Sequence, residues 1–255
     1  MKSFFRTVVQ VTVAMTAMLA VAPAMSAQPA PTAQEVLARH VSAIGGKDAI
    51  MKIKSYSSTG TMEVPAMGLS APMEISVAAP NKMISRTTIP GMGEMLNGSN
   101  GAVAWDVNPM AGPRLLADKE LEQMKENTEF YANMLYPVER FSALESMGVV
   151  EFGGEQSYKL RMVLKQSGNE TMSYFSVATG LLVGSETSAI TQMGTMQTTQ
   201  FVSDYKSFGG VKMPTRIEQM IGPNKIIVTT VEVKINAVPE SAFEVPAQIK
   251  PLIKP

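Results

Sequence analysis

The sequence predicts a mostly β, α+β protein. We expect one curled antiparallel sheet of about ten strands, an incomplete β-barrel, with helices covering its concave face. From residue 55 onward, apolar residues recur at every second position in most segments, and tight turns rich in Gly, Pro or Asn separate them. No strand–helix–strand rhythm favours a parallel sheet. Only residues 32–53 and 115–146 show helical spacing, so they alone can cover the apolar face.

Residues 1–27 have the pattern of a secretory signal peptide. Lys2 and Arg6 precede an apolar stretch, and small residues follow it. Cleavage after Ala24 and cleavage after Ala27 both fit this pattern. No Cys follows that could carry a lipid, so we expect a periplasmic protein without a lipid anchor. No later apolar run reaches the roughly 20 residues of a bilayer span, so the mature chain is expected to be soluble.

The remaining chain divides into two parts. Residues 28–34 are a polar, proline-rich leader, and residues 35–250 are long enough for a single domain. The chain has no Cys, which excludes disulfides and thiolate metal sites. Its formal net charge is zero, and we see no clustered basic face of the kind that nucleic acid binding requires.

The two helical segments have recognisable boundaries. Thr32 and Glu35 have the spacing of a capping box, and Gly45 with Gly46 ends the first helix; a further turn follows before the strands begin. In the second segment, Asp118 is the expected cap, and the stretch at 138–146 is predicted to form another short helix.

Alternation within the strands predicts which side chains face the interior of the curled sheet. In "QSYKLRMVLK", for example, Leu160 and Met162 share one face while Lys159 and Arg161 share the other. Applying the same parity to every strand gives the expected cavity-lining residues Met62, Met73, Ile75, Met83, Trp105, Leu160, Met162 and Tyr174.

Catalytic motifs are missing from the sequence. The single histidine, His40, is expected to be a surface or capping residue. We find no G-x-S-x-G elbow, no phosphate-binding loop and no dinucleotide-binding fingerprint. Zinc catalysis needs several His, Cys or carboxylate ligands that converge, and the sequence offers no such set. We therefore expect no enzymatic activity, no cofactor and no metal.

The 21 methionines leave one alternative open. Thioether sulfur suits Cu(I), and Met92 with Met95, and Met193 with Met196, have suitable spacing for a copper-binding protein. The methionines are nevertheless spread along the chain, and many fall on the apolar side of a strand. Because methionine adapts to irregular apolar partners, core packing or the lining of a lipid cavity is the favoured interpretation.

Two stretches near the C-terminus resemble a known family. They are "DYKSFGGVKMPTRIEQ" at 204–219 and "VKINAVPESAFEVP" at 233–246. The first has an Asp-Tyr pair, a Gly-containing turn and a strand that opens with Met213-Pro214. The second has the tail spacing Pro239, Phe243 and Pro246. These features, with the opening helix and first strand, are similar to the LolA-like superfamily of periplasmic lipoprotein carriers (outer-membrane lipoprotein-sorting proteins).

The resemblance implies a fold and a function. It implies an incomplete barrel whose helical lid covers a space for acyl chains, and thus a soluble periplasmic carrier or chaperone for a lipid or lipoprotein. The family's lid-locking arginine has no clear equivalent; Arg86 and Arg161 are candidates by their position on strands. The expected partners are a lipid or lipidated protein and an envelope membrane protein, and the protein is expected to be a monomer. A non-catalytic envelope interaction module remains a further alternative.

Overall fold

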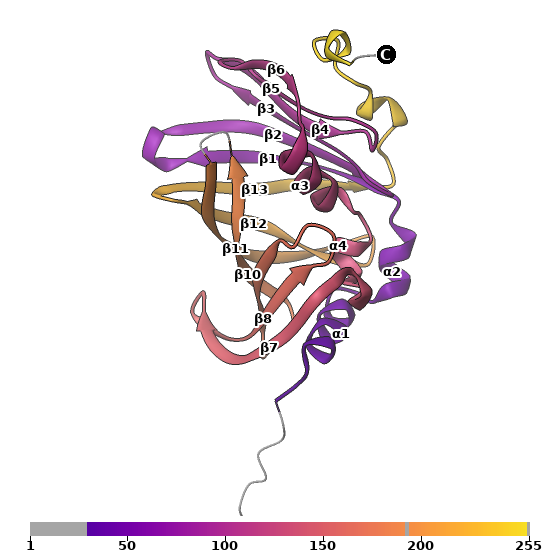
Figure 1. Cartoon of the computed structure of the whole chain (residues 1–255), viewed down its shortest axis with the longest axis vertical. Coiled ribbons are helices and arrows are strands. Elements are labelled where there is room, and N and C mark those ends of the chain that lie inside the picture. Colours follow the sequence, from indigo (N-terminus) through magenta and orange to yellow (C-terminus); the bar gives the residue numbers. More distant parts are fainter. Residues whose placement is uncertain (1–29, 192–193, 254–255) are drawn as a thin grey trace, which may run out of the picture. The chain divides into compact units, whose positions relative to one another are not determined.

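The computed structural model describes residues 30–191 and 194–253. Its dominant feature is one thirteen-stranded antiparallel sheet in the order β6-β5-β4-β3-β2-β1-β13-β12-β11-β10-β9-β8-β7 (Figure 1). The strands are β1 Ser55–Val64, β2 Leu69–Ala78, β3 Lys82–Ile89, β4 Gly93–Ser99, β5 Ala104–Asn108, β6 Gly112–Leu115, β7 Phe141–Phe152, β8 Glu155–Leu164, β9 Glu170–Ser176, β10 Leu182–Thr191, β11 Gly194–Phe208, β12 Val211–Ile221 and β13 Asn224–Ile235. The predicted class is confirmed, but the expected count was low because β4, β6 and β7 were missed.

The helices are few and short. They are α1 Ala33–Ala43, α2 Lys47–Lys52, α3 Asp118–Thr128 and α4 Ala132–Leu135, with single 3₁₀ turns η1 Pro65–Met67, η2 Val138–Arg140, η3 Glu240–Phe243 and η4 Lys250–Leu252. No helix within residues 30–191 and 194–253 is long and apolar enough to cross a membrane. Residues Pro31–Pro255 form one compact unit. The signal peptide and the leader boundary predicted from sequence stay predictions.

The first helix begins and ends as its sequence predicts. Thr32 and Glu35 form the capping box, with the Thr32 N–H donating to the Glu35 carboxylate over 2.8 Å. Gly45 follows the C-cap with a φ of 128°. A Cβ added at Gly45 would lie 2.3 Å from the carbonyl oxygen of Gly210, so only glycine permits this close approach of the helix end to the β11–β12 turn.

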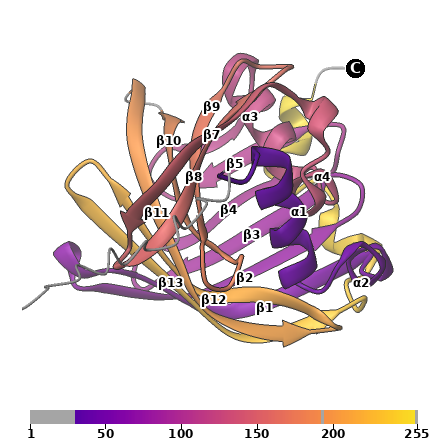
Figure 2. The ribbon, with the colours of Figure 1, turned by 90° about the horizontal axis from the view of Figure 1, so that it is seen from below.

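The sheet is open, and its topology decides what covers it. Strands β6 and β7 are consecutive in the chain but form opposite edges of the sheet. The connection between them, residues 116–140, must therefore cross from one edge to the other. It carries α3 and α4, and together with α1 these helices lie on the inner side of the curl (Figure 2). We call residues 116–140 the helical cover.

Two local predictions about the second helical segment are wrong. Asp118 does not cap α3: the N-cap residue is Ala117, and Asp118 is the first residue of the helix. The stretch at 138–146 forms the η2 turn and the start of β7 in place of a helix. Pairing with β8, for example Glu145 opposite Arg161, overrides the local pattern in that stretch.

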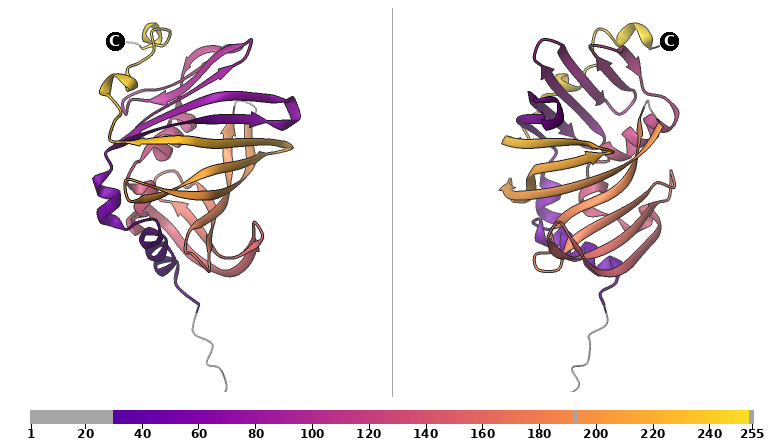
Figure 3. Two further views of the ribbon diagram at one scale, coloured as in Figure 1. Left: turned by 180° about the vertical axis from the view of Figure 1, so that it is seen from behind. Right: turned by 90° about the vertical axis from the view of Figure 1, so that its left-hand side faces the viewer.

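The convex face of β3, β4 and β5 is covered by the tail, residues 236–253. Trp105 is fully buried there, and the tail contributes Phe243 and Ile249 to the same apolar cluster as Ile84 and Leu96. Figure 3 shows the tail, in yellow, on the side of the molecule away from α1. The tail therefore completes a second core on the outer face of the sheet.

Asn236 fastens the end of β13 to the start of β1. Its backbone is left-handed, with a φ of 56°. Its side-chain oxygen accepts hydrogen bonds from the N–H groups of Lys54 and Ser55 over 2.6 and 3.2 Å, and its amide donates to the carbonyl of Lys52 over 3.0 Å. This one side chain fixes the junction of α2, β1 and β13, at the helix-covered end of the sheet.

Candidate functional site

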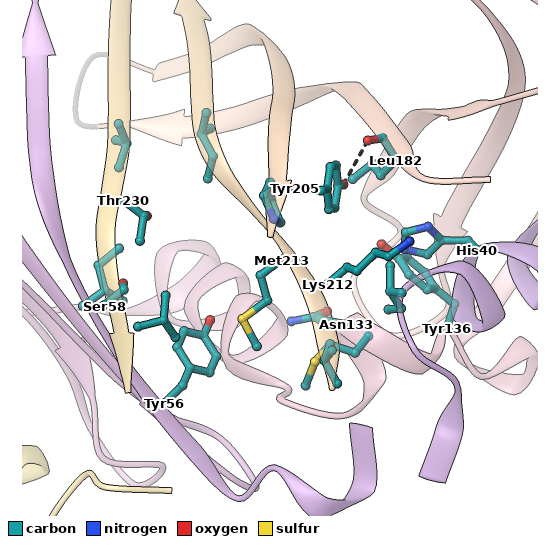
Figure 4. A pocket seen from close by; sticks show the side chains of 18 residues that line it. His40, Tyr56, Ser58, Asn133, Tyr136, Leu182, Tyr205, Lys212, Met213 and Thr230 are labelled. Atoms are coloured by element: carbon teal, nitrogen blue, oxygen red, sulfur yellow. Dashed lines mark hydrogen bonds between the residues drawn. The ribbon is translucent and has the colours of Figure 1, made fainter. Parts of the chain in front are cut away.

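A cavity of about 280 Å³ lies between the concave face of the central strands and the helices. Strands from both halves of the sheet contribute to its wall, which is mainly aliphatic (Figure 4). The apolar lining residues are Ile44, Ile75, Met134, Leu182, Val211, Met213, Pro214, Ile217, Val228 and Val233. The volume is roughly twice that of an apolar cavity known to hold one benzene molecule, so it has room for one medium-length chain.

Polar side chains are distributed around the cavity wall (Figure 4). They are His40, Tyr56, Ser58, Asn133, Tyr136, Tyr205, Lys212 and Thr230. Neither aspartate nor glutamate lines the cavity within the part of the chain that the structure describes. The cavity wall thus combines apolar side chains with neutral polar groups and one ammonium group.

His40 is buried, which corrects the expectation of a surface residue. Its side chain is 5% exposed, and Nδ1 lies 3.0 Å from the carbonyl oxygen of Gly180 in the β9–β10 turn. Its ring packs edge-on against Tyr136 and Phe175, with centroids 5.7 and 5.0 Å apart. Burial lowers the pKa of His40 to about 4, despite the opposing effect of the Gly180 hydrogen bond. At neutral pH the ring is therefore uncharged, and Nδ1–H donates to the carbonyl.

The three tyrosines at the cavity are neutral hydroxyl donors. Burial raises the pKa of Tyr56, and it also raises the pKa of Tyr136, where Arg140 acts weakly in the opposite direction. Burial, with a contribution from Tyr136, raises the pKa of Tyr205. The Tyr205 hydroxyl donates to the Leu182 carbonyl over 2.9 Å, which ties β11 to β10 beside the cavity.

Arg140 stabilises the helical cover through contacts with other residues of the same segment. Its guanidinium donates to the Asn133 side-chain oxygen over 2.7 Å and to the Glu126 carbonyl over 3.1 Å, and it pairs with Glu129 at 2.7 Å. These contacts join α3, α4 and η2 into one piece. Neither arginine considered from the sequence lies here. Arg86 pairs with Glu94 on neighbouring strands, and Arg161 pairs with carboxylates on β7 and β9.

Of the eight predicted cavity residues, Ile75 lines the cavity. Met83 packs into the apolar cluster around it, together with Met213 and Met134. Cross-strand pairing puts Met62 opposite Ala71 and Met73 opposite Gly60, so both lie on the same face as Ile75 but toward the β1–β2 turn.

The other four predicted residues lie elsewhere. Leu160 and Met162 are on the concave face but are packed beneath α1, against Val36 and Leu37. Trp105 is on the convex face under the tail. Tyr174 is likewise on the convex face, because its neighbour Phe175 packs on the concave face beneath α1. Its ring stacks on Phe152 with centroids 3.7 Å apart, and its hydroxyl donates to Glu186 over 2.6 Å.

Most residues that line the cavity were not predicted from the sequence. Met213 and Pro214 were noticed only for their resemblance to the family, and Tyr205 belongs to the same stretch. The Gly209-Gly210 turn was the one local signal, because residues 211–214 follow it directly and this turn packs against the end of α1. Local periodicity carries no such information about long-range packing.

Three of the four methionines considered for copper lie within the described residues, in two different hairpins. Met92 is 50% exposed in the β3–β4 turn, and Met95 is on β4. Met196 is on β11, whereas Met193 lies outside the described residues. Among the described residues, no group of three or more His, Asp and Glu could hold a metal ion. The thioether hypothesis itself stays a prediction.

A second hollow, of about 550 Å³, lies between the tail and β3. Its lining includes Lys82, Glu240, Glu244 and Lys250. Charged groups with solvent access make it poorly suited to an apolar ligand, because burial of such groups without partners is costly. The concave cavity is therefore the better candidate site despite its smaller volume.

Comparison with solved structures shows that the fold is similar to the folds of three proteins. The chain matches a LolA superfamily protein from Nitrosomonas europaea (TM-score 0.55, 13% identity, covering 85% of this chain and 99% of that one). It also matches a DUF1329 family protein from Desulfovibrio piger (TM-score 0.57, 11% identity, 85% and 98% covered). A third match is an outer membrane lipoprotein-sorting protein domain from Vibrio parahaemolyticus (TM-score 0.52, 14% identity, 83% and 94% covered). No protein-family model and no curated protein sequence matches the chain.

Proposed function

We propose that this protein is a periplasmic carrier that shields an acyl chain of a lipid or lipoprotein from water, without catalysis. The observation that carries the proposal is the apolar cavity of about 280 Å³ between the sheet and the helical cover. The fold shared with an outer membrane lipoprotein-sorting domain and the predicted signal peptide support it. Each methylene moved from water into such a cavity contributes roughly 0.8 kcal/mol, so one chain suffices for firm binding.

The size of the cavity sets the expected cargo. A cavity with room for one medium-length chain does not accommodate several acyl chains as it stands. Larger cargo requires the helical cover to move away from the sheet. The cover makes its internal contacts through Arg140, so it can move as one piece.

The first experiment is native mass spectrometry of protein purified gently from the periplasm, followed by organic extraction. A discrete adduct that extracts as lipid is the expected result. A bare protein mass in repeated preparations contradicts the carrier proposal and favours the interaction module. A copper-sized adduct favours the methionine alternative.

A matched pair of variants tests the site. Ile75→Glu introduces a carboxylate into the cavity wall and is expected to abolish binding of a fluorescent fatty acid. Val231→Glu makes the same kind of change at a side chain that is 77% exposed, and it is expected to leave binding unchanged. Equal binding by the two folded variants would remove this cavity from the proposal.

A further inference from the structure

The cavity differs from a purely apolar site because its lining carries a positive charge. Its lining residues within the described chain include one side chain that is charged at neutral pH, Lys212, and no carboxylate. His40 is held neutral by its burial, as described above. A purely apolar ligand would leave this one cation without a counter-charge, and a cationic ligand would be repelled by it.

Lys212 is fixed to the cavity wall through its backbone. It is the second residue of β12, and its N–H donates to the carbonyl of Ile44, just after α1, over 2.7 Å. Its side chain is exposed, so it belongs to the mouth of the cavity. Figure 4 shows the side chain extending toward His40 and Tyr136. No carboxylate lies within ion-pair distance of its ammonium group among residues 30–191 and 194–253.

Two cavity hydroxyls are also free to bind a ligand. The phenolic O–H groups of Tyr56 and Tyr136 have no hydrogen-bond partner in the described part of the chain, whereas Tyr205 donates to Leu182. A polar group facing an apolar cavity is stabilised when a ligand oxygen accepts its hydrogen bond. Tyr136 lies on the same side as Lys212, and Tyr56 lies further along the wall (Figure 4).

We propose that the cavity takes a single-chain amphiphile with an anionic headgroup, with the chain against the aliphatic wall and the anion held at the mouth by the Lys212 ammonium. The inference rests on the proposed carrier function and specifies its ligand class. A fatty-acid carboxylate and an alkyl phosphate share the required chemistry. A charge-assisted hydrogen bond at a partly solvated site corresponds to about tenfold in affinity.

The test compares twelve-carbon ligands that differ only in their headgroup. Calorimetry with delipidated mature protein measures laurate, dodecyl phosphate, dodecanol and dodecyltrimethylammonium. We expect at least one of the two anions to bind about tenfold tighter than dodecanol, and the cation to bind weakest. The preferred anion identifies whether the headgroup is a carboxylate or a phosphate. Equal affinity for anion and alcohol overturns the headgroup assignment but leaves the carrier proposal standing, whereas no binding of any ligand overturns both.

Variants at one position make the test specific. Lys212→Gln is expected to weaken binding of the preferred anion about tenfold while changing dodecanol affinity less than twofold, and Lys212→Arg is expected to retain anion binding. Lys206→Gln, an exposed lysine outside the cavity lining, is the matched control and should change neither. An equal loss for anion and alcohol in Lys212→Gln would mean that the side chain only supports the wall, and would overturn the proposal.

Discussion

The convex face around Trp105 and the concave face around Met213 belong to the same sheet, and both are lined by large apolar side chains. On the convex face, the tail lies directly on the strands, and Trp105 is left with no exposed surface. On the concave face, helices with a diameter of about 10 Å bridge a curved surface and leave about 280 Å³ unfilled. The shape of the covering segment, more than the residues of the strands, therefore determines whether a cavity remains on a face of this sheet.

The largest expected difference between the two faces is in their response to truncation. Trp105→Ala is expected to lower the free energy of unfolding by about 3–5 kcal/mol, because it empties a closed core. Met213→Ala should cost clearly less, since its side chain already borders unfilled space. Urea unfolding of both variants measures the difference.

Trp105→Phe is the control for this pair. The indole N–H of Trp105 has no hydrogen-bond partner within the described residues, so its removal sacrifices no bond. Trp105→Phe should therefore be much milder than Trp105→Ala. Similar losses for Trp105→Ala and Met213→Ala would contradict the contrast between a filled face and an unfilled one.

The concave face is also expected to be sensitive to acid. Burial lowers the pKa of His40 to about 4, below its value near 6.5 in the unfolded chain, so the unfolded state binds the extra proton between these values. Stability is fully present above pH 6.5 and falls as the pH drops toward 4, by about 3 kcal/mol in total. Unfolding measured from pH 7 to pH 4 checks this, and His40→Gln should flatten that part of the profile. An unchanged profile in His40→Gln would assign the acid sensitivity to other groups.

Filling the cavity should separate binding from stability. Ile217→Trp places a larger apolar side chain in the unfilled space, so we expect fatty-acid affinity to fall at least tenfold while the free energy of unfolding changes by less than about 1 kcal/mol. Fluorescent-ligand titration and urea unfolding measure the two quantities. Val231→Trp, at an exposed position, should leave affinity unchanged. Full ligand affinity in folded Ile217→Trp would place the binding site elsewhere.

The smallest expected effect is at the border of the convex core. Lys82 pairs with Glu240, whose side chain is 80% exposed, and this pair joins β3 to the tail. Exposed ion pairs contribute little, so Lys82→Ala should lower stability by less than about 1 kcal/mol. Limited proteolysis of the tail provides a second measurement. A loss as large as that of Trp105→Ala would mean that the pair, and not apolar packing, holds the tail in place.

Local signals were enough to predict much of the fold. The capping box of Thr32 and Glu35, the glycines at 45 and 46 and the alternation of the strands all act over a few residues, and the structure has them as predicted. The helix predicted at residues 138–146 was wrong, because this stretch pairs with β8, which follows a turn that the local pattern does not reveal. The prediction that His40 is a surface or capping residue was wrong for a related reason. The carbonyl that accepts its hydrogen bond is 140 residues away in the sequence.

The cavity was harder to predict than the fold. Alternation tells which residues of a strand share a face, but it does not tell which face becomes concave. Ile75 and Trp105 were assigned to one interior on the same reasoning, yet they lie on opposite faces of the sheet. Leu160 and Met162 were assigned to the correct face, but α1 lies over them. The position of a helix over the sheet depends on long-range packing that a strand's own sequence does not contain.

The open sheet also bears on how the protein avoids associating with other chains. Strands β6 and β7 leave one row of backbone N–H and C=O groups without a sheet partner, and such rows are templates on which a foreign strand can pair. β6 has only four residues and contains Pro113, which donates no hydrogen bond. β7 has register shifts between Phe141 and Ala143 and between Ser146 and Val149, which interrupt its regular edge. The barrel can therefore remain unclosed around its cavity while its two edges resist strand-by-strand aggregation.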